Sequence, residues 1–270
     1  MTPTSRNDID EAADRLARRP WPAVPLRGEL EVSFEFFPAA TDNGLDRLLE
    51  TAGNLAPPRP RFASVTSGAG GTDRERTQRA LDHLGRQTDL SLAGHLTTVG
   101  ATRAQTLEVV DAYLERGVDH VVALRGDPPA DGIEGADPSG RLADGFASAA
   151  ELVAGIRAHA GDRVEISVAA YPEVHPKAAS PDADLDNLKR KVDAGADRAI
   201  TQFFYDNDDF LRFQDRCRSA GISVPIVAGI MPIASFPRIS AFAGRCGAQI
   251  ADGVPELFDG LDDGPDVHQL

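Results

Sequence analysis

The chain has very little cysteine and very little lysine. Its 270 residues include two cysteines, Cys217 and Cys246, whose separation fits neither a metal site nor a disulfide framework. We expect two ordinary thiols on helices, as is usual in a reducing compartment. The three lysines, Lys177, Lys189 and Lys191, fall in one stretch. No lysine stands on a predicted strand elsewhere, which disfavours an aldolase that uses a lysine Schiff base.

Long apolar runs and an excess of positive charge are also missing. The first thirty residues are polar and hold no segment of signal-peptide or membrane-span length. The net charge of −14 and the isoelectric point near 4.8 argue against nucleic-acid and anionic-membrane partners, since both need a basic surface. We therefore expect residues 1–30 to be a polar N-terminal extension of a cytoplasmic protein, and residues 31–270 to form one catalytic barrel domain.

What the chain does have is a regular alternation of two patterns. Short apolar runs alternate with longer stretches of helical spacing, which is typical of a parallel sheet built from βα units. Thr102 and Ser180 precede helical stretches, and Gly117, Gly195 and Gly221 follow them, as helix caps should. The predicted strands span about 31–37, 61–67, 91–97, 118–125, 163–170, 197–204 and 223–229, and the predicted helices about 43–55, 73–87, 102–116, 147–159, 182–194, 207–219 and 235–246.

This pattern predicts an α/β fold of the (β/α)8 TIM-barrel type. Polar residues cluster where each strand gives way to its loop, which favours a barrel over an open doubly wound sheet. The eighth strand is missing from the pattern, because the residues after Phe258 are acidic and contain Gly and Pro but no final β-rich run. Either the barrel closes in another way or a C-terminal segment lies outside this sequence.

Two carboxylates stand at the ends of predicted strands, Glu35 in the first and Asp127 after the fourth. The alternation of side chains along a strand puts Glu35 on the face opposite Phe34 and Phe36, where a core strand would carry Val or Ile. Burial disfavours a charged carboxylate, so we expect a raised pKa and a proton that is available at neutral pH. Glu35 is therefore predicted to act as a general acid.

Further polar and aromatic side chains stand at the ends of the other predicted strands. The carboxyl ends of barrel strands meet at one mouth, so these side chains should converge on one site. Any one of them alone could equally be a hydrogen-bonded polar group of the core. The set consists of Glu35, Thr66, His95, Asp127, Tyr171, Gln202 and Phe204.

Three shorter motifs carry less information. His95 has no second histidine two residues on, which disfavours a binuclear metal hydrolase, and we expect no metal. The run 68–71 is rich in glycine, but Asp73 stands where the last glycine of a dinucleotide-binding motif belongs. The segment Arg125-Gly126-Asp127-Pro128 could be a simple turn, which would explain its Gly and Pro only.

The stretch after the fifth predicted strand carries every lysine. Asp184, Asn187 and Lys191 follow i, i+3, i+7 spacing and should share one face of a helix. That face could be an ordinary solvated surface. Alternatively, it could be a cationic ledge that binds a phosphate-bearing cofactor in an otherwise acidic protein.

Taken in order, the motifs resemble those of the bacterial methylenetetrahydrofolate reductases, from about residue 31 to residue 262. The order of the motifs along the chain makes the resemblance more specific than any one of them. They are Phe34-Glu35-Phe36-Phe37-Pro38, Ser64-Val65-Thr66, Gly94-His95-Leu96-Thr97, Leu124-Arg125-Gly126-Asp127, Ala170-Tyr171-Pro172-Glu173-Val174-His175-Pro176, Asn187-Leu188-Lys189-Arg190-Lys191, Thr201-Gln202-Phe203-Phe204 and Gly229-Ile230-Met231-Pro232.

The resemblance implies a flavoenzyme that reduces 5,10-methylenetetrahydrofolate to 5-methyltetrahydrofolate, taking hydride from NADH or NADPH through FAD in a ping-pong cycle. It also implies a homo-oligomer. Glu35 would protonate the folate so that its ring opens, and Asp127 would lie near flavin and pterin. The implied substrate contacts are Asp127, Gln202, Arg238 and Phe242, with Thr66 at the nicotinamide. The implied flavin contacts are Ser67, Ala69, His95, Arg125, Gly126, Asp127, Ala149, Tyr171, His175, Ala178, Asp184, Asn187, Arg190 and Lys191.

The chain also departs from the family pattern. Ser67 and Ser148 stand where many relatives have tyrosine, and Arg238 where relatives often have glutamine. The family's last strand, which carries a substrate-contacting arginine, is absent. Two alternatives therefore stay open: an inactive barrel that still binds FAD or folate, and a different barrel enzyme, such as a lyase or hydrolase, with Glu35 and Asp127 as acid and base.

Overall fold

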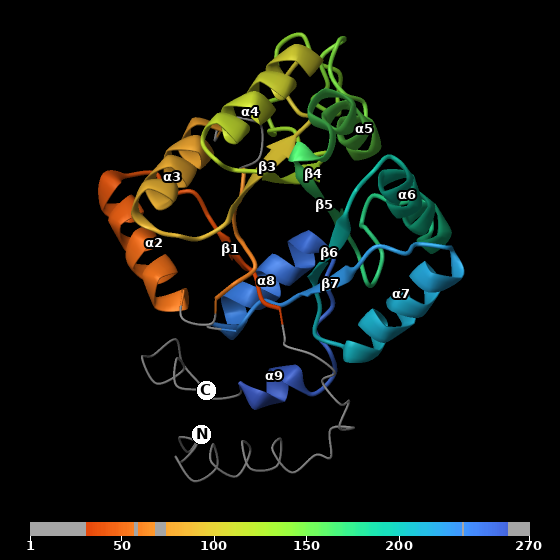
Figure 1. Cartoon of the computed structure of the whole chain (residues 1–270). Helices are drawn as coiled ribbons and strands as arrows, with labels where there is room; N and C mark the ends of the chain where they lie inside the picture. The colour runs from red at the N-terminus through yellow and green to blue at the C-terminus, as the bar shows by residue number, and fades with distance from the viewer. Residues whose placement is uncertain (1–30, 57–58, 68–73, 234, 259–270) are drawn as a thin grey trace.

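Seven strands pair side by side in the order in which they occur along the chain, and every pairing is parallel. The computed structural model describes residues 31–56, 59–67, 74–233 and 235–258. The helices from α2 to α7 surround the curled sheet on its outer side, and α8 crosses one end of it (Figure 1). The α/β barrel architecture expected from the βα alternation is therefore confirmed, while the expected N-terminal extension, residues 1–30, lies outside the described residues.

The observed elements follow the predicted ones closely in order and type. The strands are β1 Phe34–Phe36, β2 Ala63–Val65, β3 Leu92–Thr97, β4 His120–Leu124, β5 Glu165–Ala170, β6 Arg198–Phe203 and β7 Ile226–Gly229. The helices are α2 Asp42–Leu55, α3 Arg74–Gln87, α4 Arg103–Glu115, α5 Ala149–Ala160, with the 3-10 turn η2 Gly161–Arg163 after it, α6 Pro181–Asp193, α7 Asn207–Ser219, α8 Phe236–Cys246 and α9 Val254–Leu257.

The helix caps form where the sequence predicted them. Thr102 caps α4, with reciprocal hydrogen bonds between the Thr102 and Gln105 side chains and the backbone. Ser180 Oγ accepts a hydrogen bond from the backbone N–H of Ala183, and Pro181 begins α6. Gly117, which follows α4, has a φ of 74°, a left-handed conformation that glycine adopts without strain.

The two faces of the sheet differ in chemistry. The outer face carries the main hydrophobic core, in which Phe36, Val65, Val121 and Ile166 pack with buried side chains of the helices. Phe34 also packs against this core, so Glu35 points to the inner side, as the alternation predicted. The barrel interior is therefore the polar side of β1.

The sheet remains open between its first and last strands. Within the described residues, β1 pairs with β2 and β7 with β6, and no pairing joins β1 to β7. Phe37 and Ile230 directly follow these edge strands and are 68% and 82% exposed. Within the described part of the chain, the sheet has seven strands and no eighth, in agreement with the expectation from the sequence. β1 and β2 are each three residues long, shorter than the predicted 31–37 and 61–67, because their regular pairing with each other is limited to these residues.

The amino end of the barrel is filled by a charged and aromatic cluster. Buried Arg198 forms an ion pair with Glu165, and its guanidinium lies 5.4 Å from the centroid of the Phe62 ring. His120 Nε2 lies 2.7 Å from Ser167 Oγ, and burial lowers the pKa of His120 to about 3, so this ring stays neutral at physiological pH. Because this cluster occupies the amino end, the carboxyl end is left for ligands.

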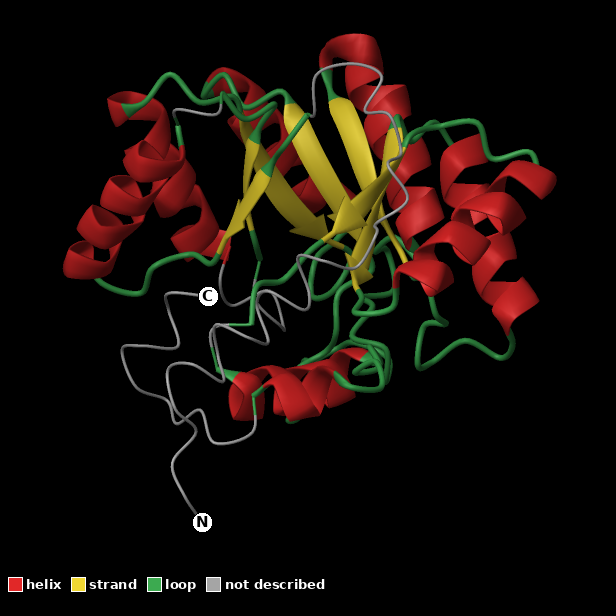
Figure 2. Cartoon of the chain, turned by 90° about the horizontal axis from the view of Figure 1, so that it is seen from below, coloured by secondary structure: helices red, strands yellow, loops and turns green. Residues whose placement is uncertain are grey.

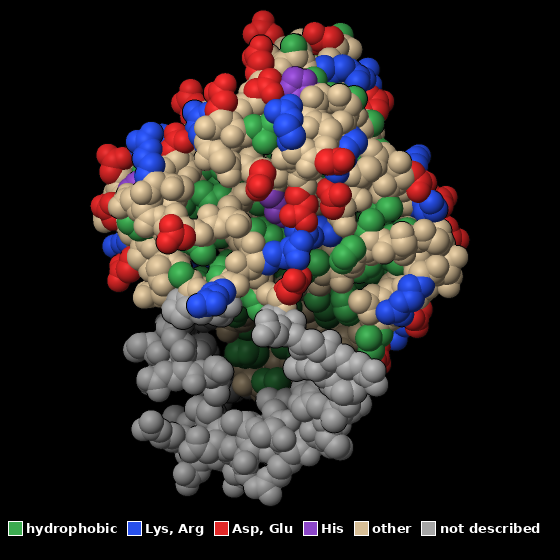
Figure 3. Space-filling view, in the orientation of Figure 1, with side chains coloured by type: hydrophobic (Ala, Val, Ile, Leu, Met, Phe, Trp, Pro, Cys, Tyr) green, Lys and Arg blue, Asp and Glu red, His purple; other side chains and the backbone are tan. Residues whose placement is uncertain are grey.

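The described surface shows both signs of charge interspersed. In Figure 3, acidic and basic side chains alternate over the visible face, with no broad area of basic side chains alone. Among the described helices, none combines the length and the apolar content that crossing a membrane requires.

Gly94 on β3 is predicted to be essential for packing against α4. A Cβ at this position would lie 2.3 Å from Cε2 of buried Tyr113, so the ring or the strand would have to move. We expect Gly94→Ala to lower the free energy of unfolding by about 1–3 kcal/mol, as overpacking typically does. Urea denaturation measures this change.

Gly53→Ala is the matched control. Gly53 lies in α2, and a Cβ there would meet no atom within 4 Å. The control should be neutral or stabilising by about 0.5–1 kcal/mol, the usual gain from alanine in a helix. Equal stabilities of the two variants would show that the Gly94 contact has no energetic importance.

Candidate active site

Six of the seven predicted site residues lie at the carboxyl ends of successive strands. Because all strands run parallel, these ends meet at one rim of the barrel, and Figure 2 shows the strands ending on the same side. The seventh, Phe204, also follows β6, but its ring stacks on Phe210 of α7 at 4.9 Å. The six rim residues are Glu35 in β1, Thr66 after β2, His95 in β3, Asp127 after β4, Tyr171 after β5 and Gln202 in β6.

Glu35 is paired with His95 across the inner side of the barrel. Glu35 Oε2 lies 3.2 Å from His95 Nε2, and the two side chains are 55% and 7% exposed. Burial acts to raise the pKa of Glu35, but contact with His95 and the charge of its ring outweigh burial, so the pKa is lowered. The Glu35 carboxylate therefore stays accessible to solvent, while the His95 ring beside it is buried.

The predicted raised pKa of Glu35 is therefore wrong for the protein without ligands. The sequence argument considered burial alone and did not identify His95 as the partner. The inward direction of Glu35 and its place at the rim were predicted correctly.

His95 is held in place by its surroundings. It lies within β3, paired with Val122 of β4, and the Tyr113 hydroxyl donates a hydrogen bond to the His95 carbonyl oxygen at 3.2 Å. The Nε2 contact with Glu35 is within ion-pair distance, yet this nitrogen makes no aligned hydrogen bond within the described part of the chain. His95 Nε2 is therefore buried against the Glu35 carboxylate without an aligned hydrogen bond.

Asp127 is held by two cations. Lys177 Nζ donates a hydrogen bond to Asp127 Oδ1 at 2.7 Å, and Arg125 Nη2 lies 3.5 Å from the same oxygen. The hydrogen bond from Lys177, followed by smaller effects that include the charges of Lys177 and Arg125, lowers the pKa of Asp127. Gly126 has a φ of 81°, and a Cβ there would lie 2.9 Å from Thr97 Cβ. The turn therefore requires glycine and sets the direction of Asp127.

Tyr171, His175 and Asp184 form a connected group after β5. The Tyr171 and His175 rings meet edge to face at 4.6 Å, and the backbone N–H of His175 donates to Asp184 Oδ2 at 2.9 Å. The backbone N–H of Lys177 donates to His175 Nδ1 at 2.9 Å, which leaves the neutral ring's proton on Nε2. Burial lowers the pKa of His175 and raises that of Tyr171 to about 12.

The predicted cationic ledge on α6 is not a single exposed face. Lys191 is 6% exposed, and its Nζ donates a hydrogen bond to the Ala169 carbonyl oxygen of β5. Burial lowers the pKa of Lys191 to about 8. Arg190 is exposed and lies 3.4 Å from Asn187 Oδ1. The helical spacing was correct, but Lys191 faces the sheet because its position coincides with the apolar side of the helix.

The other predicted contacts are spread around the rim. Gln202 Oε1 accepts a hydrogen bond from the backbone N–H of Phe203, and Ser148 Oγ caps α5, which begins at Ala149. Ser67 is half-buried, Ala178 donates its N–H to the His175 carbonyl, and Ala69 lies outside the described residues.

Helix α8 lies beyond the carboxyl ends of β6 and β7. Phe242 stacks on Phe203 at 5.7 Å, so its ring takes part in the packing between α8 and the sheet, while Arg238 is exposed. At the far end of α8, the backbone N–H of Gln249 donates to the Glu173 carboxylate at 3.0 Å. The helix therefore reaches from the end of β7 to the loop after β5.

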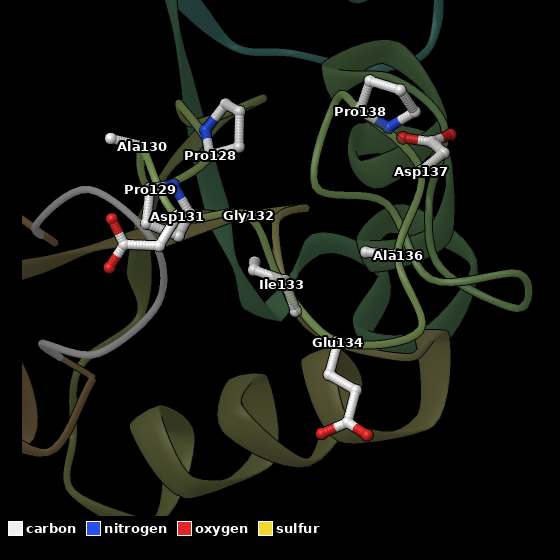
Figure 4. Close-up of a pocket in the computed structure, with 10 residues that line it drawn as sticks. All are labelled: Pro128, Pro129, Ala130, Asp131, Gly132, Ile133, Glu134, Ala136, Asp137 and Pro138. Atoms are coloured by element: carbon white, nitrogen blue, oxygen red, sulfur yellow. The ribbon is translucent and has the colours of Figure 1, made fainter.

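Two features were not predicted from the sequence. One is the contact of Lys177 with Asp127, although the place of Lys177 in the loop after β5 indicated that it could reach the rim. The other is an open pocket of about 650 Å³ within the loop Pro128–Pro138. Figure 4 shows that the Asp131 and Glu134 carboxylates of this loop point in different directions. Among the described residues, no three His, Cys, Asp or Glu side chains gather in a way that could hold a metal ion.

The sequence matches the family model described as methylenetetrahydrofolate reductase over residues 23–270. It is 44% identical over 245 residues to the 5,10-methylenetetrahydrofolate reductase of Pectobacterium carotovorum subsp. carotovorum, an alignment that covers 91% of this chain and 78% of that protein. The chain belongs to the methylenetetrahydrofolate reductase family. It is therefore an oxidoreductase by family.

Two other proteins extend this comparison. A rice protein named probable methylenetetrahydrofolate reductase (NADH) is 39% identical over 245 residues, covering 87% of this chain and 41% of that protein. A Clostridium thermocellum protein whose structure contains two copies of 5-methyl-5,6,7,8-tetrahydrofolic acid aligns with a TM-score of 0.60 at 13% identity, covering 88% and 78% of the two chains. The latter supports the fold of this reductase-family chain.

His95→Phe is predicted to raise the pKa of Glu35. The substitution removes the ring nitrogen but keeps a ring beside Glu35, so the effect of burial would remain without the opposing effect of His95. In the parent, the lowered pKa stabilises the fold above the unfolded-state pKa, and this contribution is lost as the pH falls through the folded-state pKa. Carboxyl-selective NMR titration measures the change directly.

His159→Phe is the control, because it breaks a His159–Asp111 pair of 2.8 Å between α5 and α4. The Glu35 titration should be unchanged in this variant. An unchanged Glu35 titration in His95→Phe itself would contradict the assigned cause of the shift.

Proposed function

We propose that this chain reduces 5,10-methylenetetrahydrofolate to 5-methyltetrahydrofolate, with hydride from NADH passed through FAD in a ping-pong cycle. Membership of the methylenetetrahydrofolate reductase family supports the folate reaction. The observation that carries the proposal is the rim, where one parallel sheet carries Glu35 with its His95 partner on β1 and β3, and Asp127 with its cations after β4. NADPH is the alternative hydride donor.

The residues around the rim fit an FAD molecule. Gly126 makes the tight left-handed turn that carries Arg125 and Asp127 at the end of β4, and Asp127 is exposed there beside Lys177. Arg125 and exposed Arg190 offer positive charge to a diphosphate in a protein of net charge −14. Bound FAD would supply hydride transfer between the nicotinamide and the folate. We propose that Tyr171, His175, Asp184 and Asn187 complete this site.

The nicotinamide site is assigned to the rim at Thr66. The backbone of Thr66 is fixed from two sides, since its N–H donates to Phe36 and its carbonyl accepts from the Thr77 hydroxyl at 2.8 Å. Its side chain is half-buried and stays at the end of β2. The name of the rice relative favours NADH as the donor.

Glu35 is proposed to donate the proton that opens the folate ring. Without ligands, His95 favours the charged carboxylate. A folate that covers the half-exposed side chain would remove water from it, which favours the protonated form. Glu35 can then give its proton to a folate nitrogen within hydrogen-bond reach, while His95 holds the other side of the carboxyl group.

Asp127 and Gln202 are proposed to orient the folate. Asp127 can accept hydrogen bonds from the polar edge of the pterin, and the Gln202 amide stands two strands away at the same rim. Arg238 on α8 would meet the acidic tail of the substrate, and Phe242 would shape the wall from its stack on Phe203.

A second function is favoured by one observation. Over the described residues, no pairing joins β1 to β7, and exposed Phe37 and Ile230 directly follow these strands. A barrel open at this place could bind FAD or folate without completing the reaction. Flavin binding with no reduction of methylenetetrahydrofolate would identify this alternative.

Glu35→Gln is predicted to separate the two half-reactions. Glutamine keeps the shape of the side chain but supplies no proton, so reduction of the flavin by NADH should proceed near the parent rate. Reduction of methylenetetrahydrofolate should fall by at least about a hundredfold, within the range for general acid catalysis. Stopped-flow absorbance with each substrate separately measures the two rates.

Glu31→Gln is the control, because this exposed carboxylate precedes β1 at the amino end, 3.1 Å from Arg61. Both half-reactions should keep their rates in the control. Equal losses in both half-reactions of Glu35→Gln would mean that Glu35 shapes the site and is no proton donor.

A further inference from the structure

Lys177 is the lysine that reaches the rim. Its Nζ donates to Asp127 Oδ1 at 2.7 Å across fifty residues of sequence, from the loop after β5 to the turn after β4. The other two lysines have partners elsewhere: Lys189 pairs with Asp193 at 2.6 Å, and Lys191 is buried against Ala169. The contact is therefore specific to Lys177.

The backbone around Lys177 is fixed by hydrogen bonds. The Lys177 N–H donates to His175 Nδ1, and the His175 N–H donates to Asp184 Oδ2, both at 2.9 Å. The Ala178 N–H donates to the His175 carbonyl oxygen at 2.8 Å, and α6 begins three residues later at Pro181. The loop is thus tied to α6, which limits where the Lys177 side chain can reach.

Both cations near Asp127 hold the same oxygen. Lys177 Nζ and Arg125 Nη2 lie 2.7 and 3.5 Å from Oδ1, and Oδ2 has no hydrogen-bond partner among the described residues. His175 is the other titratable group of this loop that influences the carboxylate. One oxygen of Asp127 is occupied, and the other is available to a ligand that donates hydrogen bonds.

We propose that Lys177 is a positioning residue for Asp127: it fixes the carboxylate through Oδ1, directs Oδ2 toward the ligand site and offsets the negative charge at the rim. The proposal rests on the proposed function for what Asp127 does with that oxygen. A bound flavin would then be influenced by the Asp127 carboxylate and the Lys177 ammonium group together. An isolated aspartate would disfavour the negatively charged reduced flavin more strongly than this pair does.

The first test needs no cofactor. Carboxyl-selective NMR titration of the full chain should give a higher pKa for Asp127 in Lys177→Met than in the parent, since the hydrogen bond and the positive charge are both removed. Lys189→Met is the matched control, with the same change of charge on α6, and should leave Asp127 unchanged. An unchanged Asp127 pKa in Lys177→Met would overturn the proposal.

The second test uses the flavin-loaded protein and a reference dye. Lys177→Met should lower the equilibrium constant for flavin reduction roughly two- to fivefold, the effect expected of one partly exposed charge pair. In an Asp127→Asn background the same substitution should have a smaller effect, because Lys177 is no longer held at the rim. Equal effects in both backgrounds would overturn the positioning role, since Lys177 would then act without Asp127.

The two tests separate this proposal from the proposed function. A protein that binds no flavin, yet shows the rise of the Asp127 pKa in Lys177→Met, would disprove the flavin-dependent reaction and support the role of Lys177. A protein that binds flavin, yet shows an unchanged Asp127 pKa in Lys177→Met, would leave the flavin-dependent reaction standing and disprove the role of Lys177.

Discussion

The parallel, in-order pairing of the seven strands is the constraint on which the site depends. A helix after each strand returns the chain to the amino end of the sheet, where the next strand begins. Every strand therefore ends at the same rim, at the carboxyl end. Glu35, His95 and Asp127 come from three separate strand ends and meet for this reason. A single antiparallel strand would have placed its polar end on the opposite side, beside the amino-end cluster of Arg198 and Glu165.

Compensation of negative charge is the second theme. The protein has a net charge of −14, yet both carboxylates assigned to the chemistry have a basic partner, His95 for Glu35 and Lys177 for Asp127. These contacts lower the pKa of each carboxyl and keep both groups ionised before ligands arrive. Ligands that displace water or the basic partners would change the protonation states, which connects binding to proton transfer.

Most of the fold followed from local patterns in the sequence. The βα alternation predicted every strand in order, and Thr102, Ser180 and Gly117 marked helix ends that the structure confirms. These features depend on neighbours along the chain, which a sequence displays directly. Strand ends were less accurate, because the lengths of β1 and β2 depend on which residues pair between strands, which one strand's sequence does not show.

Contacts between distant segments could not be predicted in the same way. The lowered pKa of Glu35 depends on His95, sixty residues away, and the sequence argument saw only burial. Lys191 was expected on a charged face, but the direction of α6 against β5 buries it. Lys177 and Asp127 were both named from the sequence, but the contact between them was not predicted. Electrostatics at the rim therefore required the tertiary structure.

The most direct test of the account is the absorbance of the purified full chain under anaerobic conditions. The protein, alone or after addition of FAD, should show a flavin spectrum that NADH bleaches. Methylenetetrahydrofolate added after removal of the nicotinamide should restore the colour. A protein that stays colourless with added FAD, or a reduced flavin that methylenetetrahydrofolate does not reoxidise, would contradict the central claim.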